Sequence, residues 1–239
     1  MALSRAIVAG GTGAVGEGIV RMLAAAGVAV FVPARSRERL DGLLARLPAA
    51  SRERVSGQVV AMDDVDAIAG FGREVARAHG PVDAVVASLG GWAQGEALLG
   101  VAEPVFRRAL DDGLGAHFRV MRALAPQLVD HPSSYTFVNG FSARAPYPQA
   151  GPVSVSAAGQ LMLAQVLAAE LADAPLRVNA LVLGPVMTRA RTHGRPEWLR
   201  ADDVGRFIVE VARSTARGEV FSLLNRAELD AARARLGAA

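Results

Sequence analysis

Glycines cluster in the segment Gly10–Gly18, directly after the first apolar run of the chain and before an amphipathic pattern. Glycine at a strand-to-helix turn lets backbone amides approach a diphosphate at the helix N-terminus. The spacing G-x-G-x-x-G fits the fingerprint of a dinucleotide-binding turn. The alternative is a tight turn that only packs the helix on the strand. The expected phosphate-binding residues are Gly11, Thr12, Gly13 and Gly16.

Two arginines, Arg35 and Arg37, stand about twenty residues later, where the second apolar run ends. Folds that bind NAD place a carboxylate there to hold the ribose hydroxyls, and this position has none. Guanidinium groups suit a 2′-phosphate, so Arg35 predicts that NADP(H) is preferred over NAD(H). The alternative is that both arginines are solvated and open the next helix, with Ser36 as its N-cap.

A carboxylate, Glu17, lies inside the glycine segment. It suits the positive end of a helix dipole. Within about 4 Å of a diphosphate, however, it costs roughly 1–4 kcal/mol in repulsion. A side chain that turns to solvent removes this repulsion, and the sequence leaves both orientations open.

The chain lacks lysine and cysteine, so all 26 basic residues are arginine. Without cysteine there are no disulfides, thiolate metal sites or cysteine nucleophiles. Without lysine there is no Schiff-base chemistry. No histidine or carboxylate group has metal-ligand spacing, so we expect no metal, and Ser142 has no evident partners for a hydrolase triad. The phenols are Tyr135 and Tyr147.

Charge and hydropathy exclude other classes of partner. The formal net charge is +3 and the arginines are spread along the 239 residues, so we expect no nucleic-acid partner. No uncharged apolar run reaches the roughly 18 residues of a membrane helix, and the N-terminus lacks signal-peptide features. These observations predict a soluble protein in the cytoplasm with no membrane partner.

Apolar strands alternate with amphipathic helices along the whole chain, which predicts an α/β fold. We expect a single Rossmann domain over residues 1–239, with a doubly wound, seven-stranded parallel sheet and helices on both faces. The irregular segment 184–198 is expected to act as a lid. The expected strands are Ala6–Ala9, Val28–Val32, Gln58–Ala61, Ala84–Ala87, Tyr135–Val138, Val178–Val182 and Val220–Leu223. The expected helices are Ile19–Ala26, Glu38–Leu47, Ile68–Ala78, Leu114–Leu128, Gln160–Leu171 and Arg226–Leu236.

Further landmarks follow the glycine segment in a fixed order. They are Asp63, Ala87-Ser88-Leu89-Gly90, Arg177-Val178-Asn179-Ala180, Leu183-Gly184, Thr188 and Asp202-Asp203-Val204. In this order, with Gly16-Glu17-Gly18 as a closing G-x-G, the sequence resembles the short-chain dehydrogenase/reductase family over essentially its whole length. The resemblance implies that Asp63 lies toward the adenine of the cofactor. It also implies that Gly90 helps to hold the dinucleotide and that Thr188 and the backbone before it contact the nicotinamide end.

The same resemblance implies hydride transfer by an Asn, Ser, Tyr and Lys tetrad, and here the sequence departs from the family. Ser142 matches the serine, but Gly113 stands at the asparagine position. The Y-x-x-x-K pair becomes Val153 and Ala157. A phenol is a useful acid near neutral pH only beside a cation that lowers its pKa. Loss of a positioned general acid typically costs about 10²–10⁴ in rate.

Tyr147 and His117 are the candidate proton donors that stand in for the missing pair. Tyr147 follows Ser142 by five residues, and His117 follows Gly113 by one helical turn. The alternative for Tyr147 is an exposed or substrate-packing side chain. The alternative for His117 is a histidine satisfied in a contact between helices.

Two functions therefore remain open. The first is an oxidoreductase that binds NADP(H) and a small-molecule substrate, with hydride transfer that is slow or carried by residues outside the family pattern. The second is a non-catalytic NADP(H)-binding protein that acts as a sensor or assembly partner. The resemblance also implies a homodimer or homotetramer through the fifth and sixth helices, and the apolar stretch 157–171 suits such burial.

Overall fold

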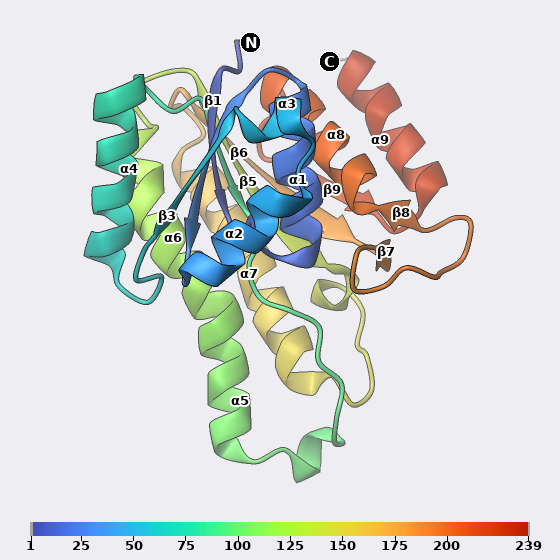
Figure 1. The fold of residues 1–239 in the computed structure, drawn as a ribbon. Coiled ribbons are helices and arrows are strands. Elements are labelled where there is room, and N and C mark those ends of the chain that lie inside the picture. Colours follow the sequence, from blue (N-terminus) through green and yellow to red (C-terminus); the bar gives the residue numbers. More distant parts are fainter. Residues whose placement is uncertain (1, 239) are drawn as a thin grey trace.

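The structure, a computed structural model, describes residues 2–238 around a seven-stranded parallel sheet (Figure 1). The strand order is β3-β2-β1-β4-β5-β6-β9. The strands are β1 (Arg5–Ala9), β2 (Ala29–Ala34), β3 (Val55–Val59), β4 (Ala84–Ala87), β5 (Ser133–Gly140), β6 (Leu176–Leu183) and β9 (Val220–Leu223). The chain runs outward from β1 to β3 and then returns to β4, on the other side of β1. Ligands of such sheets bind at this switch point, outside the carboxyl ends of the strands.

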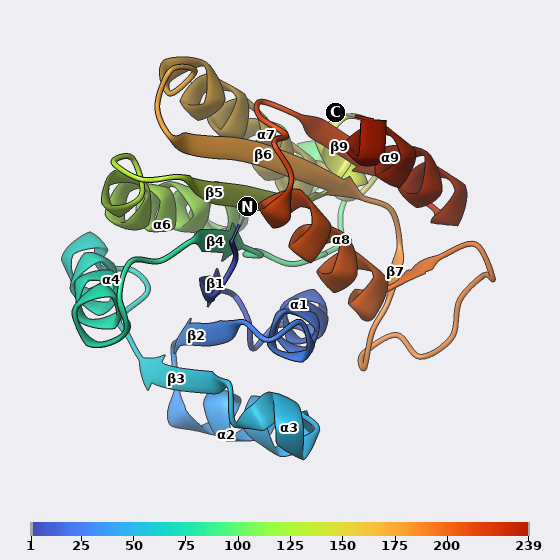
Figure 2. The ribbon, with the colours of Figure 1, turned by 90° about the horizontal axis from the view of Figure 1, so that it is seen from above.

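Helices cover both faces of the sheet (Figure 2). Helices α1, α2, α8 and α9 contribute to the apolar core on one face, and α4, α6 and α7 contribute to the core on the other. The helices are α1 (Ala14–Ala25), α2 (Arg37–Arg46), α3 (Ala49–Arg52), α4 (Val65–His79), α5 (Glu103–Leu110), α6 (Ala116–Leu124), α7 (Gly151–Glu170), α8 (Ala201–Arg213) and α9 (Arg226–Ala238). The predicted doubly wound α/β fold is confirmed.

Burial explains why the central strands read as continuous apolar runs. All eight residues of β6 are buried, as are seven of the eight in β5. Strands of a parallel sheet lose both faces to helices, so alternation of polar and apolar residues is absent. This is the pattern from which the sheet was predicted.

Helices α1 and α8 cross at small residues. A Cβ atom on Gly18 would lie 2.5 Å from the Ala201 Cβ atom, and a Cβ atom on Gly205 would lie 2.6 Å from the Gly18 carbonyl oxygen. The last glycine of the Gly16-Glu17-Gly18 motif therefore serves the close approach of two helices. This contact also fixes the axis of α1, whose first turn follows the glycine loop.

The third strand starts three residues and ends two residues before the predicted range Gln58–Ala61, because β3 spans Val55–Val59. Its register is set by β2, which pairs Val30 with Val55. Glycine weakens a strand in propensity terms, but a Cβ atom on Gly57 would lie 2.5 Å from the Leu40 Cδ2 atom. The lack of a side chain at Gly57 therefore allows Leu40 of α2 to pack closely against the strand.

The predicted helix Leu114–Leu128 is also incomplete. The helical segment begins with α5 at Glu103, continues through a π-helical turn over Asp111–Gly115 (η2) and then through α6. None of the residues of α5 is buried, and this helix lies wholly before the predicted range Leu114–Leu128. Pro126 lies in the short 3-10 helix Ala125–Gln127 that ends the segment.

Helix α7 begins nine residues before the predicted start at Gln160, because Pro152 occupies its first turn and Gly159 does not interrupt it. This 20-residue helix is the one in the described chain that is long and apolar enough to cross a membrane, which the sequence analysis did not anticipate. By length and composition alone this is weak evidence, since a core helix passes the same test. Here α7 packs against β5 and β6.

The 184–198 segment has more local structure than the irregular pattern predicts. Strand β7 (Val186–Met187) pairs with β8 (Leu199–Arg200) in a separate parallel ladder. Between them, Thr188 and Arg191 form an antiparallel bridge with reciprocal backbone hydrogen bonds of 3.0 Å. The segment thus leaves the sheet and displays a tight turn at Arg189 and Ala190.

Candidate active site

The glycine loop lies between the carboxyl ends of β1 and β4 and leaves no room for a side chain at Gly10 or Gly16. Gly10 has a φ of 84°, and a Cβ atom there would lie 2.0 Å from the Ser88 carbonyl oxygen. A Cβ atom on Gly16 would lie 2.1 Å from the Gly10 carbonyl oxygen. Glycine at both positions lets the two loops and the start of α1 approach closely. Gly11, Thr12 and Gly13 form the turn between β1 and α1.

The N-terminus of α1 is suited to an anion. Its N-cap, Gly13, makes no side-chain hydrogen bond to the first turn, so backbone amides of that turn are left without a protein cap. By contrast, Ser36 caps α2, and its hydroxyl accepts from the Arg39 amide at 3.4 Å. This confirms the predicted cap. Free amides at a helix N-terminus fit a diphosphate.

The side chain of Glu17 does not extend to solvent. An orientation toward solvent was the one expected to remove its repulsion of a diphosphate. Its side chain is 7% exposed, and its Oε2 atom lies 2.8 Å from Arg46 Nε and 3.2 Å from Arg189 Nε. Arg21 Nη1 lies 3.7 Å from Oε1. Guanidinium groups therefore neutralise the carboxylate next to the glycine loop.

The candidate adenosine-side residues lie at the carboxyl ends of the neighbouring strands. Arg35 follows β2 and is exposed, as is Arg37. Neither arginine makes an ion pair within residues 2–238. Asp63 follows β3 and is exposed, and its neighbour Asp64 caps α4 by accepting from the Asp66 amide at 2.8 Å. Arg35 and Asp63 are thus free to contact a ligand.

Ser142 lies at the end of β5 in the 3-10 turn Phe141–Ala143, and it is 5% exposed. Asn139, three residues before it, fastens β5 to α7, because its Nδ2 atom donates to the Ala157 carbonyl at 2.7 Å. Val153 and Ala157 both lie on α7, in its first two turns. The sequence analysis did not find this role for Asn139.

A compact polar cluster of Ser156 and Gln160 joins α7 to the π-helical turn. No sequence motif pointed to this cluster. Ser156 Oγ accepts from the Leu114 amide at 3.0 Å and from Gln160 Nε2 at 3.2 Å. A Cβ atom on Gly113 would lie 2.2 Å from Ser156 Oγ. Gly113 therefore leaves the room that Ser156 and Gln160 occupy, and a larger side chain there requires this cluster to move. Gly90, with a φ of 85°, faces the same group.

Tyr147 belongs to an aromatic cluster formed with Trp92 and Phe141. Its ring centroid lies 4.9 Å from Trp92 and 5.6 Å from Phe141. Tyr147 is 38% exposed and Trp92 is 44% exposed. The Gly95 amide donates to the Gln149 carbonyl at 2.9 Å, which ties together the two loops that carry these rings. A signal for Trp92 was available, because it follows Gly90 by two residues.

His117 lies in the core rather than at the surface of this region. It is fully buried and stacks on Phe137 with ring centroids 5.6 Å apart. Burial lowers the pKa of His117 to about 4, and the backbone of Leu89 acts in the opposite direction. The imidazole is therefore neutral at pH 7. The other phenol, Tyr135, is also fully buried, and burial raises its pKa far above the usual range.

Most of the chain matches the sequence model of a known protein family. A sequence model described as short chain dehydrogenase matches residues 4–197. The chain belongs to the short-chain dehydrogenase/reductase family. It is 29% identical over 186 residues to Dehydrogenase/reductase SDR family member 4 of Bos taurus, covering 77% of this chain and 66% of that protein.

Solved structures of short-chain dehydrogenases/reductases have the same fold. A short-chain type dehydrogenase/reductase from Mycobacterium ulcerans matches with a TM-score of 0.86 at 20% identity, over 96% of this chain and 91% of that one. A short chain oxidoreductase from Pseudomonas aeruginosa PAO1, described as containing an atypical catalytic center, matches with a TM-score of 0.79 at 23% identity. That match covers 92% of this chain and 95% of the other.

The site lacks residue types that the family's Asn, Ser, Tyr and Lys tetrad requires. The chain has no lysine, and its two tyrosines are Tyr135 inside β5 and Tyr147 in the following loop. Helix α7 therefore carries neither member of a Tyr-Lys pair. That Val153 and Ala157 occupy those two positions stays a prediction.

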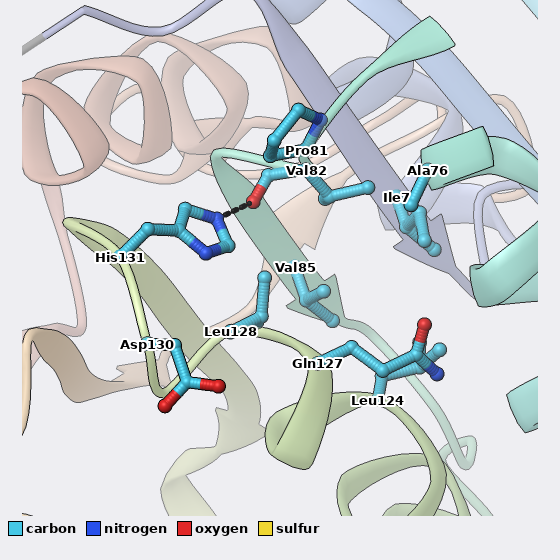
Figure 3. A pocket seen from close by; sticks show the side chains of 10 residues that line it. All are labelled: Ile7, Ala76, Pro81, Val82, Val85, Leu124, Gln127, Leu128, Asp130 and His131. Carbon is cyan, nitrogen blue, oxygen red and sulfur yellow. Dashed lines mark hydrogen bonds between the residues drawn. The ribbon is translucent and has the colours of Figure 1, made fainter. Parts of the chain in front are cut away.

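A cavity lies away from this site (Figure 3). It has a volume of about 260 Å³ and is bounded by the amino end of β4, by α4 and by the segment that leads into β5. His131 lies at its side and bonds the Val82 carbonyl at 2.9 Å. Because the glycine loop lies at the carboxyl ends of the strands, this cavity is on the opposite edge of the sheet. Among the described residues, no cluster of side chains fits a metal ion.

Proposed function

We propose that this chain is an NADP(H)-binding oxidoreductase of the short-chain dehydrogenase/reductase family in which hydride transfer is slow or depends on residues other than a Tyr-Lys pair. The observation that carries the proposal is the glycine loop at the switch point of the sheet. Side chains are excluded from it on steric grounds at Gly10 and Gly16, and its helix N-terminus has no side-chain cap. Such a cradle fits a diphosphate.

The proposed contacts follow the order of the strands. We assign the diphosphate to Gly11, Thr12, Gly13 and Gly16. Arg35 would hold the 2′-phosphate, and Asp63 would lie toward the adenine. Gly90 and Thr188 would lie at the nicotinamide end, with residues 184–198 as the lid. A bound nicotinamide supplies or accepts the hydride.

The preference for NADP(H) over NAD(H) rests on charge at the end of β2. Arg35 and Arg37 are exposed and make no ion pair within the described chain. A guanidinium can donate two hydrogen bonds to a phosphate. Residues 34–37 include no carboxylate that could bind ribose hydroxyls, and the next acidic residue along the chain, Glu38, lies in the first turn of α2.

For the substrate side we propose that Ser142 orients a carbonyl or alcohol and that Tyr147 supplies the proton. The partly exposed ring of Tyr147 favours it over His117, which is buried and neutral at pH 7. His117 remains the second candidate, as a neutral hydrogen-bond donor. A substrate seated beside Ser142 would meet the aromatic cluster.

The alternative is a non-catalytic NADP(H)-binding protein that acts as a sensor or in assembly. It is favoured by the lack of any lysine in the chain, because no ammonium is available to lower the pKa of a phenol. The Pseudomonas protein of similar fold is described as having an atypical catalytic center. That description is compatible with either alternative.

We also propose a homodimer or homotetramer formed through α5, α6 and α7, the elements that correspond to the family's fifth and sixth helices. Its support is apolar exposure: Val105 on α5 is 59% exposed, Phe118 on α6 is 48% exposed and Met162 on α7 is 59% exposed. A cytoplasmic location and the absence of a membrane or nucleic-acid partner remain predictions.

Titration with NADPH and NADH tests the binding proposal. We expect NADPH to bind more tightly, and we expect Arg35→Gln to weaken NADPH binding roughly 10- to 100-fold, because one charge-assisted contact is lost. NADH binding should change less than twofold. Quenching of Trp92 and Trp198 fluorescence provides the measurement. Failure of the wild-type chain to bind either nucleotide would contradict both functions.

The same preparation is then supplied with ketones, quinones and enoyl compounds, and NADPH oxidation is followed. Turnover that falls at least 100-fold in Tyr147→Phe but not in His117→Ala identifies the proton donor. Tight binding without turnover on any substrate favours the non-catalytic alternative. Fast turnover unaffected by either substitution would contradict the proposed chemistry.

A further inference from the structure

Glu17 is a buried carboxylate in the first turn of the helix that follows the glycine loop. Burial of an unpaired carboxylate there carries a large desolvation cost. The structure meets this cost with ion pairs to Arg46 at 2.8 Å and to Arg189 at 3.2 Å. Arg46 comes from the end of α2 and Arg189 from the 184–198 segment. The carboxylate therefore joins elements that are distant in sequence.

Arg189 makes a second contact, and this one reaches the glycine loop itself. Its Nη2 atom donates to the Thr12 carbonyl at 3.2 Å, while its Nε atom faces Glu17. One planar guanidinium thus bridges the backbone of the loop and the carboxylate of α1. The side chain is still 40% exposed, so part of the guanidinium remains open to solvent.

The backbone around Arg189 holds it in this position. Thr188 and Arg191 exchange backbone hydrogen bonds of 3.0 Å, and Thr188 Oγ1 accepts from the Ala190 amide at 3.2 Å. Arg189 therefore stands at the tip of a tight turn. Because Thr188 belongs to the same turn, a contact that holds Arg189 at the glycine loop also restricts the position of Thr188.

The charge balance of this group favours an anion. Glu17 and Asp202 supply two negative charges, and Arg21, Arg46 and Arg189 supply three positive charges, since Arg21 Nε also bonds Asp202 at 3.0 Å. The net charge is +1, next to the uncapped start of α1. The arginines have removed the repulsion that Glu17 alone would impose on a diphosphate.

We propose that Arg189 is a diphosphate-binding residue and that Glu17 is the positioning residue that holds it, and with it Thr188, against the glycine loop. This inference rests on the proposed nucleotide binding and deepens it. Glu17 acts only through Arg189: its carboxylate fixes the direction of the guanidinium, and the turn Thr188–Arg191 transmits that position to the 184–198 segment.

Two nucleotides separate this role from general stability. NADPH carries the diphosphate, whereas adenosine 2′,5′-bisphosphate ends at the first 5′-phosphate. We expect Arg189→Gln to weaken NADPH binding roughly 10- to 100-fold and to change bisphosphate binding less than about threefold. Arg73→Gln is the matched control, because it removes the same charge from an exposed position on α4, which packs on the opposite face of the sheet from α1. It should leave both affinities unchanged.

Coupling between Glu17 and Arg189 is measured with a double-mutant cycle. We expect Glu17→Gln to weaken NADPH binding about tenfold, and the double variant to bind no worse than Arg189→Gln alone. Arg189→Lys should bind with intermediate affinity, because an ammonium keeps the charge but cannot bridge two partners in a planar fork.

A second readout does not depend on the nucleotide. Glu17→Gln keeps every arginine of the 184–198 segment, so trypsin meets the same cleavage sites as in the wild-type chain. We expect faster cleavage after Arg189 and Arg191 in this variant, and unchanged cleavage elsewhere. Equal cleavage rates would overturn the positioning role, even where a variant is too unstable for titration.

The possible failures are distinct. If the wild-type chain binds neither NADPH nor the bisphosphate, the proposed function fails. If the wild-type chain binds both but Arg189→Gln behaves like Arg73→Gln, Arg189 does not contact the diphosphate. If Glu17→Gln and Arg189→Gln have fully additive effects, Glu17 does not act through Arg189.

Discussion

His117 shows how burial sets the chemistry of a single side chain. Its ring lies between α6 and β5 with no exposed surface, and burial lowers its pKa from 6.5 to about 4. Among the described residues, neither ring nitrogen has a hydrogen-bond partner of normal geometry. The residue type suggested an acid near neutral pH, whereas its surroundings keep it neutral.

This pKa predicts an acid-sensitive stability. Below pH 6.5 the unfolded chain takes up a proton on His117, but the folded chain does not until about pH 4. The free energy of unfolding therefore falls as the pH drops through this window. Between pH 7 and pH 5 we expect His117 to contribute a loss of about 2 kcal/mol.

Urea unfolding of His117→Leu at both pH values measures this contribution. The variant should lose about 2 kcal/mol less than the wild-type chain between pH 7 and pH 5. His193→Gln, at an exposed position, should follow the wild-type dependence. An identical pH dependence in all three proteins would contradict this prediction, because it would mean that His117 takes up its proton over the same pH range in the folded and the unfolded chain.

At the scale of elements, the crossing of α1 and α8 depends on backbone contact. A Cβ atom on Gly18 would lie 2.5 Å from the Ala201 carbonyl carbon and 2.6 Å from its oxygen. These atoms belong to the start of α8 and cannot move without the helix. The crossing supports the first turn of α1 from behind, so it links the packing of two helices to the glycine loop.

Gly18→Ala should therefore destabilise the fold by about 1–3 kcal/mol, the usual cost of overpacking. Gly70→Ala provides the control, because Gly70 also lies inside a helix but its nearest neighbouring atom would be 3.8 Å from the new Cβ atom. Its helix propensity should improve stability by up to about 1 kcal/mol. Equal urea midpoints for the two variants would contradict the packing argument.

At the scale of the whole molecule, helix α7 exposes several apolar side chains on one face of the domain. Val155, Met162 and Val166 are spaced along one face of α7 and are 46%, 59% and 45% exposed. Helix α5 projects beyond the sheet beside α7 (Figure 1), and none of its residues is buried. An apolar surface of this kind is typical of an interface between subunits.

We expect the wild-type chain to form dimers or tetramers. Met162→Arg should raise the dissociation constant of the oligomer at least tenfold, because an unpaired guanidinium would be buried at the interface. Val59→Arg serves as control: Val59 is 44% exposed but lies on β3, far from α7 in the strand order. Sedimentation analysis gives the masses. A monomeric wild-type chain at high concentration would contradict the proposed interface.

Much of the fold was predictable because its signals are local. Apolar runs followed by amphipathic helices predict a parallel sheet, and the glycine spacing after the first run predicts the turn that begins α1. The boundaries of β3, α5 and α7 were not predictable in this way. Gly57 and Gly159 reduce local propensity, but contacts with Leu40 and Leu114 explain why glycine stands there.

The sequence by itself determined which chemistry is available: a glycine cradle, arginines in place of lysines, and no tyrosine or lysine on α7. Only the tertiary structure decided how these groups are used. It paired Glu17 with Arg189, 172 residues apart by their numbers, buried His117, and gathered Trp92 with Tyr147. The physical reason is that charge pairing, desolvation and ring contacts depend on distances between atoms. Those distances are set by the packing of elements far apart in the chain.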